Sequence, residues 1–305
     1  MKKVCLLLAC AGLVHATTFY VTVAGLGGEP EYEQRFSGWA KDIDKAVRAG
    51  NDVKVETLYG SAATRDKLRS VLGDIARDAK PGDALVLMLI GHGTYDGTEY
   101  KFNLPGPDVS ASELATLLDR IPARQLVVNM TSASGGSRAV LEKQNRAVIT
   151  ATKTGTEKNA TVFARYWVEA LRDPAADTDK NEVISALEAF RYAEQKTAKF
   201  YETQKRLATE HPILEDTGKG EGTKNPSPEN GQGLLASRIP VMRLSNAQNS
   251  ANTPEKRQLL ARKEELEQQI DALKYQKAAI PVEQYKRQLS SLLVELAKTQ
   301  AELDK

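Results

Sequence analysis

Two strand-like segments end in residues that could perform chemistry. The segment at residues 126–137 reads LVVNMTSASGGS, and it places Ser132 and Ser134 where a buried strand presents a nucleophile. His92, in the segment LIGHGTYDG, directly follows another apolar run. A histidine there can act as a general acid or base, and Gly93 allows a backbone N–H to face an oxyanion. The alternative for His92 is a turn residue without a chemical role.

A second candidate site lies in the acidic segment 177–188, DTDKNEVISALE. An EF-hand loop supplies calcium ligands from its positions 1, 3, 5, 7 and 12. Here those positions hold Asp177, Asp179, Asn181, Val183 and Glu188. Glu182 stands where the sharp turn requires glycine, which strains the backbone. The segment therefore predicts either a Ca²⁺ site or an acidic loop in which Asp179 or Asn181 caps the next helix.

Strand-like and helix-like segments alternate along residues 17–245, which is typical of a parallel sheet covered by helices on both faces. The runs ALVLMLI and QLVVNM are almost continuously apolar, as strands buried on both faces are. We therefore expect an α/β three-layer sandwich with a mostly parallel sheet. In such sheets, sites form at the carboxyl ends of the strands, where both candidate loops lie. The segment SRIPVMRL is expected to add one last edge strand, where Pro240 is tolerated.

The carboxyl-terminal part of the chain has a different composition. Residues 246–254 are polar and typical of a linker, whereas residues 255–305 are charged and helical. After a break at Pro281, apolar residues recur at alternating spacings of four and three, as in a coiled coil. Helices of this length are not stable alone. We expect a helical hairpin that closes the domain, or a coiled-coil device for self-association.

Residues 1–16, MKKVCLLLACAGLVHA, have the pattern of an export leader, with Lys2 and Lys3 before an apolar run. Cleavage after Ala16 predicts a periplasmic or extracellular protein, and lipid attachment at Cys10 is the alternative. The run is too short to span a bilayer as a helix. Both cysteines of the chain lie in this leader, so the mature protein is expected to have no disulfide and no cysteine nucleophile.

The charge of the chain is balanced. It contains 42 basic and 40 acidic residues, and loss of Lys2 and Lys3 with the leader would leave 40 of each. A neutral chain without a basic segment argues against nucleic acid and anionic membranes as partners. We expect a peptide or protein ligand instead, with possible self-association through residues 255–305.

The run LVLMLIGHG, followed one strand later by LVVNMTSASGG, resembles the caspase-like cysteine peptidase superfamily. The nearer resemblance is to its legumain (C13) branch, and RAVITATKTGTEKNATVFARYWVEAL is similar to the strand, loop and helix that come next there. The resemblance covers about residues 19–244 and implies a six-stranded, mostly parallel sheet between helices. It also implies that His92 is the catalytic histidine and Gly93 the oxyanion-binding glycine.

The nucleophile motif of that family is approximately Asp-Ala-Cys-x-Ser-Gly, which places Ser132 at the cysteine and Met130 at the aspartate. A thiol with a pKa of about 8.5 is readily ionised. A serine needs a base in hydrogen-bond contact that is oriented by a third group, and no carboxylate adjoins His92 in sequence except Asp96. We expect a site that has lost its catalyst and binds or scaffolds, with a hydrolase using Ser132 and His92 as the alternative.

A legumain-like pocket would use the first loop and the strand that follows the nucleophile. The resemblance assigns Gln34, Arg35, Thr152 and Glu157 to substrate binding. The remaining histidine of the mature chain, His211, precedes Pro212 and is expected to be a structural turn residue.

Overall fold

A computed structural model describes residues 16–50, 52–220, 222–244 and 253–305. The predicted leader up to residue 15, with Cys10, and most of the predicted linker lie outside the described residues. Among the helices in the described ranges, none has both the length and the apolar character needed to cross a bilayer.

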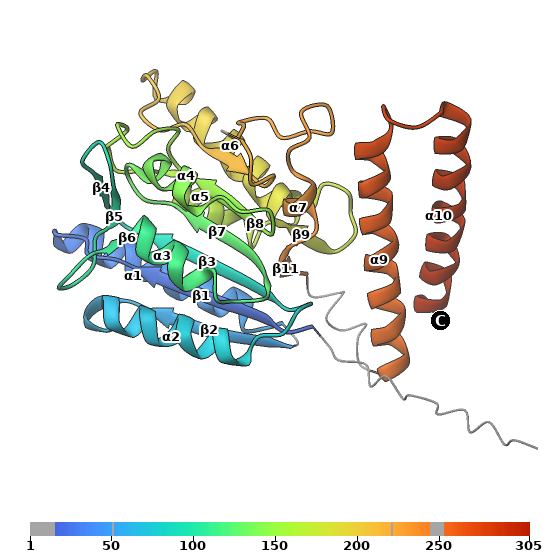
Figure 1. Ribbon diagram of the computed structural model, residues 1–305, viewed down its shortest axis with the longest axis horizontal. Helices are drawn as coiled ribbons and strands as arrows, with labels where there is room; N and C mark the ends of the chain where they lie inside the picture. The colour runs from blue at the N-terminus through green and yellow to red at the C-terminus, as the bar shows by residue number, and fades with distance from the viewer. Residues whose placement is uncertain (1–15, 51, 221, 245–252) are drawn as a thin grey trace, which may run out of the picture.

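A six-stranded sheet with strand order β10-β8-β7-β3-β1-β2 forms the centre of the molecule (Figure 1). Five strands are parallel, and β10 is antiparallel to β8. The strands are β1 (Thr18–Ala24), β2 (Val53–Leu58), β3 (Ala84–Ile90), β7 (Arg124–Asn129), β8 (Arg146–Thr150) and β10 (Ile213–Glu215). The expected mostly parallel sheet is therefore confirmed.

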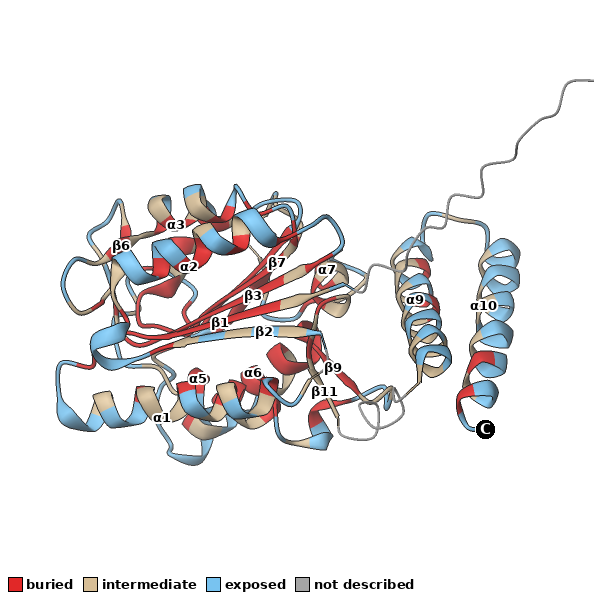
Figure 2. Ribbon diagram, turned by 90° about the horizontal axis from the view of Figure 1, so that it is seen from below, coloured by how far each residue is buried: buried red, intermediate tan, exposed pale blue. Residues whose placement is uncertain are grey.

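Helices cover both faces of this sheet, which confirms the three-layer sandwich (Figure 2). One face carries α1 (Pro30–Val47), α5 (Phe163–Ala170), α6 (Ala186–Thr203) and α7 (Leu234–Ser237). The other carries α2 (Arg65–Asp78), α3 (Ala111–Leu118) and α4 (Arg138–Leu141).

The central strand β3 explains why its sequence is continuously apolar. Val86, Met88 and Ile90 pack into the core on the α1 side, whereas Leu85, Leu87 and Leu89 pack into the core on the α2 side. Each fully buried aliphatic side chain of this kind contributes about 1.5–3 kcal/mol relative to exposure. Both faces of the strand are therefore fixed, and the loop after it leaves the sheet at a defined point.

Two small antiparallel sheets flank the core. One contains β4 (Gly93–Tyr95), β5 (Tyr100–Phe102) and β6 (Val109–Ser110), and the other pairs β9 (Val183–Ser185) with β11 (Pro240–Arg243). The described part of the chain also contains short 3-10 helices: η1 (Gly60–Ala62), η2 (Ser134–Ser137) and η3 (Pro174–Ala176).

The expectation that SRIPVMRL adds an edge strand to the main sheet is wrong. That segment forms β11, which pairs with β9, and the sixth strand of the main sheet is β10. β10 has only three residues, so it is too short to show the alternation by which strands are recognised in sequence.

The carboxyl-terminal residues form a helical hairpin of α9 (Pro254–Gln276) and α10 (Val282–Leu303). Figure 1 shows α9 between the α/β domain and α10. Thr253 caps α9 by accepting a hydrogen bond from the Lys256 N–H. The predicted leucine face of α10 is turned inward, and Thr299 and Leu303 at its end are buried.

Helix α9 is docked on the domain through polar contacts. Lys263 Nζ donates to the Asn181 carbonyl at 3.2 Å, and the Tyr275 hydroxyl donates to the Gln232 carbonyl at 2.8 Å. An ion pair joins Glu264 to Arg243 of β11. The hairpin therefore closes the domain on one side, and self-association through it stays a prediction.

Candidate functional site

The loops after β3, β7 and β8 meet at one edge of the sheet. β3 and β7 pair in parallel with Leu89 opposite Asn129, so His92 and Ser132 both follow directly at that edge. We call His92, Gly93 and the loop 132–137 the strand-end site. The structure therefore brings the predicted catalytic residues together on neighbouring strands.

The hydroxyl group of Ser132 is fully engaged with the backbone of Gly93. It accepts a hydrogen bond from the Gly93 N–H at 3.1 Å and donates one to the Gly93 carbonyl at 3.2 Å. Ser132 is 3% exposed. The N–H that the resemblance assigns to an oxyanion is thus bound by Ser132 itself.

The His92 ring lies between aromatic side chains and is half-buried. Its centroid is 4.8 Å from the ring of Tyr32 and 5.2 Å from that of Phe36, both in edge-on geometry. Burial lowers the pKa of His92, and a hydrogen bond to the Gly27 backbone and the charge of Glu29 oppose that effect. Among the hydrogen bonds of the described residues, none joins His92 to Ser132.

The backbone after Ser132 is strained. Ala133 has φ of +57°, a left-handed conformation that costs a non-glycine residue about 1–3 kcal/mol. Its N–H donates to the Glu157 carbonyl at 2.8 Å, which holds it in place. Gly135 lies so close to the backbone of Lys153 and Thr154 that a side chain would overlap it. The loop is therefore locked against the segment that follows β8.

A buried network of neutral polar groups lies beneath the loop. The Tyr100 hydroxyl lies 2.6 Å from Thr131 Oγ1 and donates to Asn129 Oδ1 at 3.2 Å, and Asn129 donates to Ser137 Oγ at 3.0 Å. Burial raises the pKa of Tyr100, so the hydroxyl stays protonated. Met130, at the aspartate position of the family motif, packs in the apolar core.

The residues expected to bind substrate occupy different environments. Thr152 is buried, and its hydroxyl accepts from the Gly135 N–H at 2.8 Å and lies 3.2 Å from Ser134 Oγ. Gln34 and Arg35 are exposed on α1, where Arg35 pairs with Glu31 and lies over the Tyr32 ring. Thr152 thus supports the loop 132–137 from the buried side. Gln34 and Arg35 lie on the surface of α1, next to Tyr32, which contacts the His92 ring.

Glu157 has a partner that the sequence did not indicate. Its carboxylate lies 2.6 Å from Nδ1 of His211, the expected turn residue, and also accepts from the Lys153 N–H at 2.7 Å. The two residues are 54 positions apart, and β10 brings them together. A strand of three residues gives no periodic pattern, so no local feature of the sequence predicts this pair.

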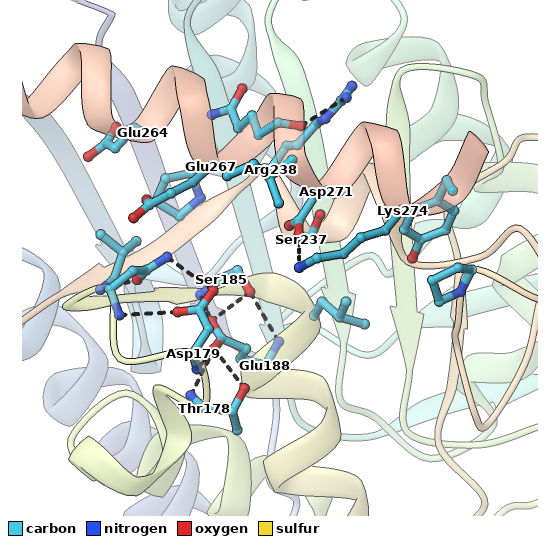
Figure 3. Close-up of a pocket in the computed structure, with 18 of the residues that line it drawn as sticks. Thr178, Asp179, Ser185, Glu188, Ser237, Arg238, Glu264, Glu267, Asp271 and Lys274 are labelled. Carbon is cyan, nitrogen blue, oxygen red and sulfur yellow. Dashed lines mark hydrogen bonds and ion pairs between the residues drawn. The ribbon is translucent and has the colours of Figure 1, made fainter. Parts of the chain in front are cut away.

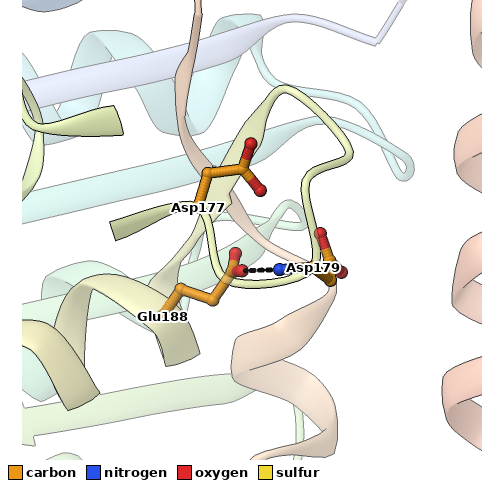
Figure 4. A group of neighbouring side chains, drawn as sticks. All are labelled: Asp177, Asp179 and Glu188. Atoms are coloured by element: carbon orange, nitrogen blue, oxygen red, sulfur yellow. Dashed lines mark hydrogen bonds between the residues drawn. The ribbon is translucent and has the colours of Figure 1, made fainter. Parts of the chain in front are cut away.

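The acidic loop, residues 177–188, gathers three carboxylates (Figure 4). Oxygen atoms of Asp177, Asp179 and Glu188 all lie within 4.8 Å of one another. Glu182 adopts a left-handed conformation with φ of +71°, as the glycine of an EF-hand loop would, so the expected backbone strain is present. The donors are carboxylates, which suit calcium.

The helix after the acidic loop is not capped by Asp179 or Asn181, and this expectation is wrong. Ser185 is the N-cap of α6, and its side chain forms a capping box with Glu188. Asp179 and Asn181 instead accept hydrogen bonds from loop amides at 3.1 and 2.8 Å. Ser185 is the N-cap because the short strand β9 lies between Asp179 and Asn181 and the first residue of α6.

A cavity of about 430 Å³ separates the acidic loop from α9 (Figure 3). Carboxylates face it from both sides, Asp179 and Glu188 from the loop and Glu264, Glu267 and Asp271 from α9. Burial and repulsion from Glu188 raise the pKa of Asp179 to about 6. Burial raises the pKa of Glu267 to about 7, with Lys263 opposing the shift and the negative charges of Asp179 and Asp271 adding to it. The α9 carboxylates are ion-paired, Glu264 with Arg243, Glu267 with Lys263 and Asp271 with Lys274, so part of the negative charge that faces the cavity is balanced.

Comparison with known proteins gives structural likeness without sequence similarity. No protein-family model and no curated protein sequence matches the chain. Similar solved structures include caspase-1 from Spodoptera frugiperda, with 13% identity, coverage of 66% of this chain and 87% of that one, and a TM-score of 0.47.

Two further structures are similar to the same degree. Protein GSU0716 from Geobacter sulfurreducens has 13% identity, coverage of 75% of this chain and 99% of that one, and a TM-score of 0.46. The Drosophila initiator caspase Dronc has 10% identity, coverage of 66% and 80%, and a TM-score of 0.44. All three scores lie below 0.5, so the fold class rests on the strand order and layers of this chain.

Proposed function

We propose that the chain is an exported homologue of caspase-like peptidases, nearest the legumain branch, in which serine replaces the nucleophilic cysteine. In this proposal the site is catalytically degenerate and binds a peptide or protein segment, as a scaffold does. The observation that supports it is the pairing of the Ser132 hydroxyl with both backbone groups of Gly93 rather than with His92.

The chemistry of serine explains why this pairing matters. Attack on a carbonyl requires that a base remove the hydroxyl proton, and here the proton is directed at the Gly93 carbonyl, which is no base. Turning the hydroxyl toward His92 would leave two buried backbone groups unpaired, at a cost of about 1–3 kcal/mol each. The arrangement favours a stable binding surface over a nucleophile.

Labelling with a fluorophosphonate probe tests this proposal. We expect the wild type and Ser132→Ala to show equal, background labelling. Labelling of the wild type that Ser132→Ala abolishes would contradict degeneracy. Ser132→Cys supplies a second test, because new cleavage of a peptide library would indicate that only the nucleophile is missing.

The second candidate is a hydrolase that uses Ser132 and His92. The strained Ala133 favours it, since strained backbone beside a nucleophile is often part of a mechanism. In this case a ligand would have to displace Ser132 from Gly93, which would free the N–H for an oxyanion. Mass spectrometry of an acyl-enzyme on Ser132 would establish this function, and its absence with all tested esters would remove it.

The export proposal rests on the leader, and its test is the mature amino terminus. A first residue at Thr17 supports cleavage, and a lipidated Cys10 supports anchoring. A third role, self-association through residues 255–305, is favoured by the exposed Val282, Leu293 and Val294 of α10. Light scattering of the full chain and of a chain ending at residue 254 would distinguish a monomer from an assembly.

For the acidic loop we propose calcium as the ligand, held by Asp177, Asp179 and Glu188 with Asn181 and the Val183 carbonyl. The close carboxylates and the left-handed Glu182 support this. Calorimetric titration should give heat with calcium and none with Asp179→Asn. No heat at millimolar calcium would remove the proposal.

A further inference from the structure

A second histidine lies at the same edge of the sheet as the strand-end site. In the strand order β10-β8-β7-β3, His211 precedes β10, Ser132 follows β7 and His92 follows β3. Because β10 runs antiparallel to β8, its first residue lies at the carboxyl end of β8. Ser132 therefore lies between two histidines, of which the mechanism discussed above uses one.

No hydrogen bond in the described part of the chain joins His92 to a carboxylate, whereas His211 has such a partner in Glu157. Glu157 Oε1 lies 2.6 Å from His211 Nδ1, and Glu157 Oε2 accepts from the Lys153 N–H at 2.7 Å. A carboxylate on one ring nitrogen fixes the tautomer and the orientation of the ring. The side chain of His211 is 46% exposed and that of Glu157 only 19%. Among the hydrogen bonds of the described residues, none involves Nε2 of His211, so this nitrogen is left for a ligand.

The pair is attached directly to the loop of Ser132. The Glu157 carbonyl accepts the N–H of Ala133 at 2.8 Å, which is the residue after Ser132. Extending the register of β10 and β8 places His211 opposite Thr152, whose hydroxyl accepts the Gly135 N–H. A peptide seated on the loop would therefore pass beside the pair.

The backbone on both sides of His211 is anchored. Glu210 is 2% exposed, and its carboxylate accepts from the N–H groups of Val162 and Phe163 at 2.7 and 3.1 Å. Pro212 and β10 follow on the other side. The contact between His211 and Glu157 lies at the surface and adds little stability, so stability of that contact does not explain the anchored backbone. The anchored backbone does give the exposed ring a fixed position, which recognition requires.

We infer that His211, oriented by Glu157, recognises a basic side chain of a peptide bound at the strand-end site. In the tautomer that directs Nδ1–H at Glu157, Nε2 can accept a hydrogen bond from a cationic donor. The negative charge of Glu157 behind the ring favours an ammonium or guanidinium donor over a carboxylate. This inference rests on the proposed peptide-binding function.

Histidine-labelled protein provides a direct test, because the full chain has only three histidines and His15 is in the leader. Carbon-13 imidazole signals are assigned with His92→Asn and His211→Asn. The probes are acetylated and amidated peptides Ala-Ala-X-Ala-Ala, with lysine, arginine, glutamine or glutamate at X. We expect the lysine and arginine peptides to shift the His211 signal and the Ala133 amide.

Two variants separate recognition from folding. Glu157→Gln keeps the size of the side chain and removes the negative charge behind the His211 ring, so it should weaken binding of the lysine peptide about tenfold. Glu202→Gln, at an exposed residue of α6, should leave binding unchanged. Backbone amide spectra of both variants report whether the fold is preserved.

The possible failures are distinguishable. Shifts at Ala133 with no change at His211 would overturn the inference and leave peptide binding intact. Equal binding of the glutamate and lysine peptides would overturn the basic class of ligand. Absence of any shift at about 10 mM of all four peptides would overturn both the inference and the proposed function.

Discussion

The strand-end site and the acidic loop differ in how their polar atoms are satisfied. At the strand-end site, neutral groups pair with one another, as Ser132 does with Gly93 and Tyr100 with Asn129. In the acidic loop, three carboxylates lie within 4.8 Å of one another, whereas the α9 carboxylates across the cavity are each paired with a lysine or arginine. The first region holds one geometry without a ligand, whereas the second has negative charge that a cation would neutralise.

This difference has a physical reason. Buried neutral groups carry no free-energy penalty for unpaired polar atoms once each has its hydrogen-bond partner. Such a network also fixes one arrangement of the side chains. Like charges raise each other's pKa, so their proximity is unfavourable until a proton or a metal ion arrives. Three predictions test this contrast, from the largest expected loss or gain in stability to the smallest, and a fourth concerns the pH dependence of stability.

Gly135→Ala should break the strand-end site. Its methyl group would overlap the backbone of Lys153 and Thr154, which cannot move without shifting the loop after β8. We expect a loss of about 3 kcal/mol in the free energy of unfolding, measured with urea. Gly38→Ala in α1 is the control, because its methyl group meets no atom within 4 Å and should stabilise by about 0.5–1 kcal/mol. Equal effects would contradict the tight packing of the loop.

Ser132→Ala tests whether the serine stabilises its site. The change leaves the N–H and the carbonyl of Gly93 without their partner, and we expect a loss of about 2 kcal/mol in the free energy of unfolding. A serine kept only as a nucleophile would instead give an unchanged or raised stability on substitution. Ser290→Ala on the exposed face of α10 is the matched control and should change little.

Calcium should stabilise the acidic loop and leave the strand-end site unaffected. At free calcium about five times its Kd, the expected gain is about 1 kcal/mol, seen as a higher Tm. Asp179→Asn should abolish the gain, and Ser132→Ala should retain it. An equal rise with magnesium, or in the Asp179→Asn protein, would indicate a general ionic effect instead.

The last prediction concerns the pH dependence of stability and Glu210, the buried carboxylate next to His211. Burial raises its pKa to about 7, above the ordinary value of 4.5, although three donors oppose the shift. The folded state therefore binds a proton more tightly than the unfolded state, and this contribution to stability is lost as the pH rises from 4.5 through 7. Glu210→Gln should flatten the dependence of Tm on pH in that range. If the slope of Tm against pH is unchanged in Glu210→Gln, a group other than Glu210 causes the pH dependence.

The sequence predicted the features that depend on long or continuous patterns. The apolar runs of β3 and β7 are buried on both faces, so they predicted a parallel sheet and the edge at which His92 and Ser132 lie. The spacing of the leucines predicted the inward face of α10, and the position of Glu182 predicted a strained loop. Each of these patterns is local, because periodicity and turn chemistry act over a few residues.

Other features were decided only by tertiary structure. The hydroxyl of Ser132 bonds to Gly93, 39 residues away, and Glu157 meets His211 across 54 residues through a strand too short to recognise. The carboxylates of α9 reach the acidic loop only because α9 docks there. A sequence determines which groups a segment carries, but the partner of each polar group depends on distant packing. The roles proposed for Ser132 and His211 are argued from those partners.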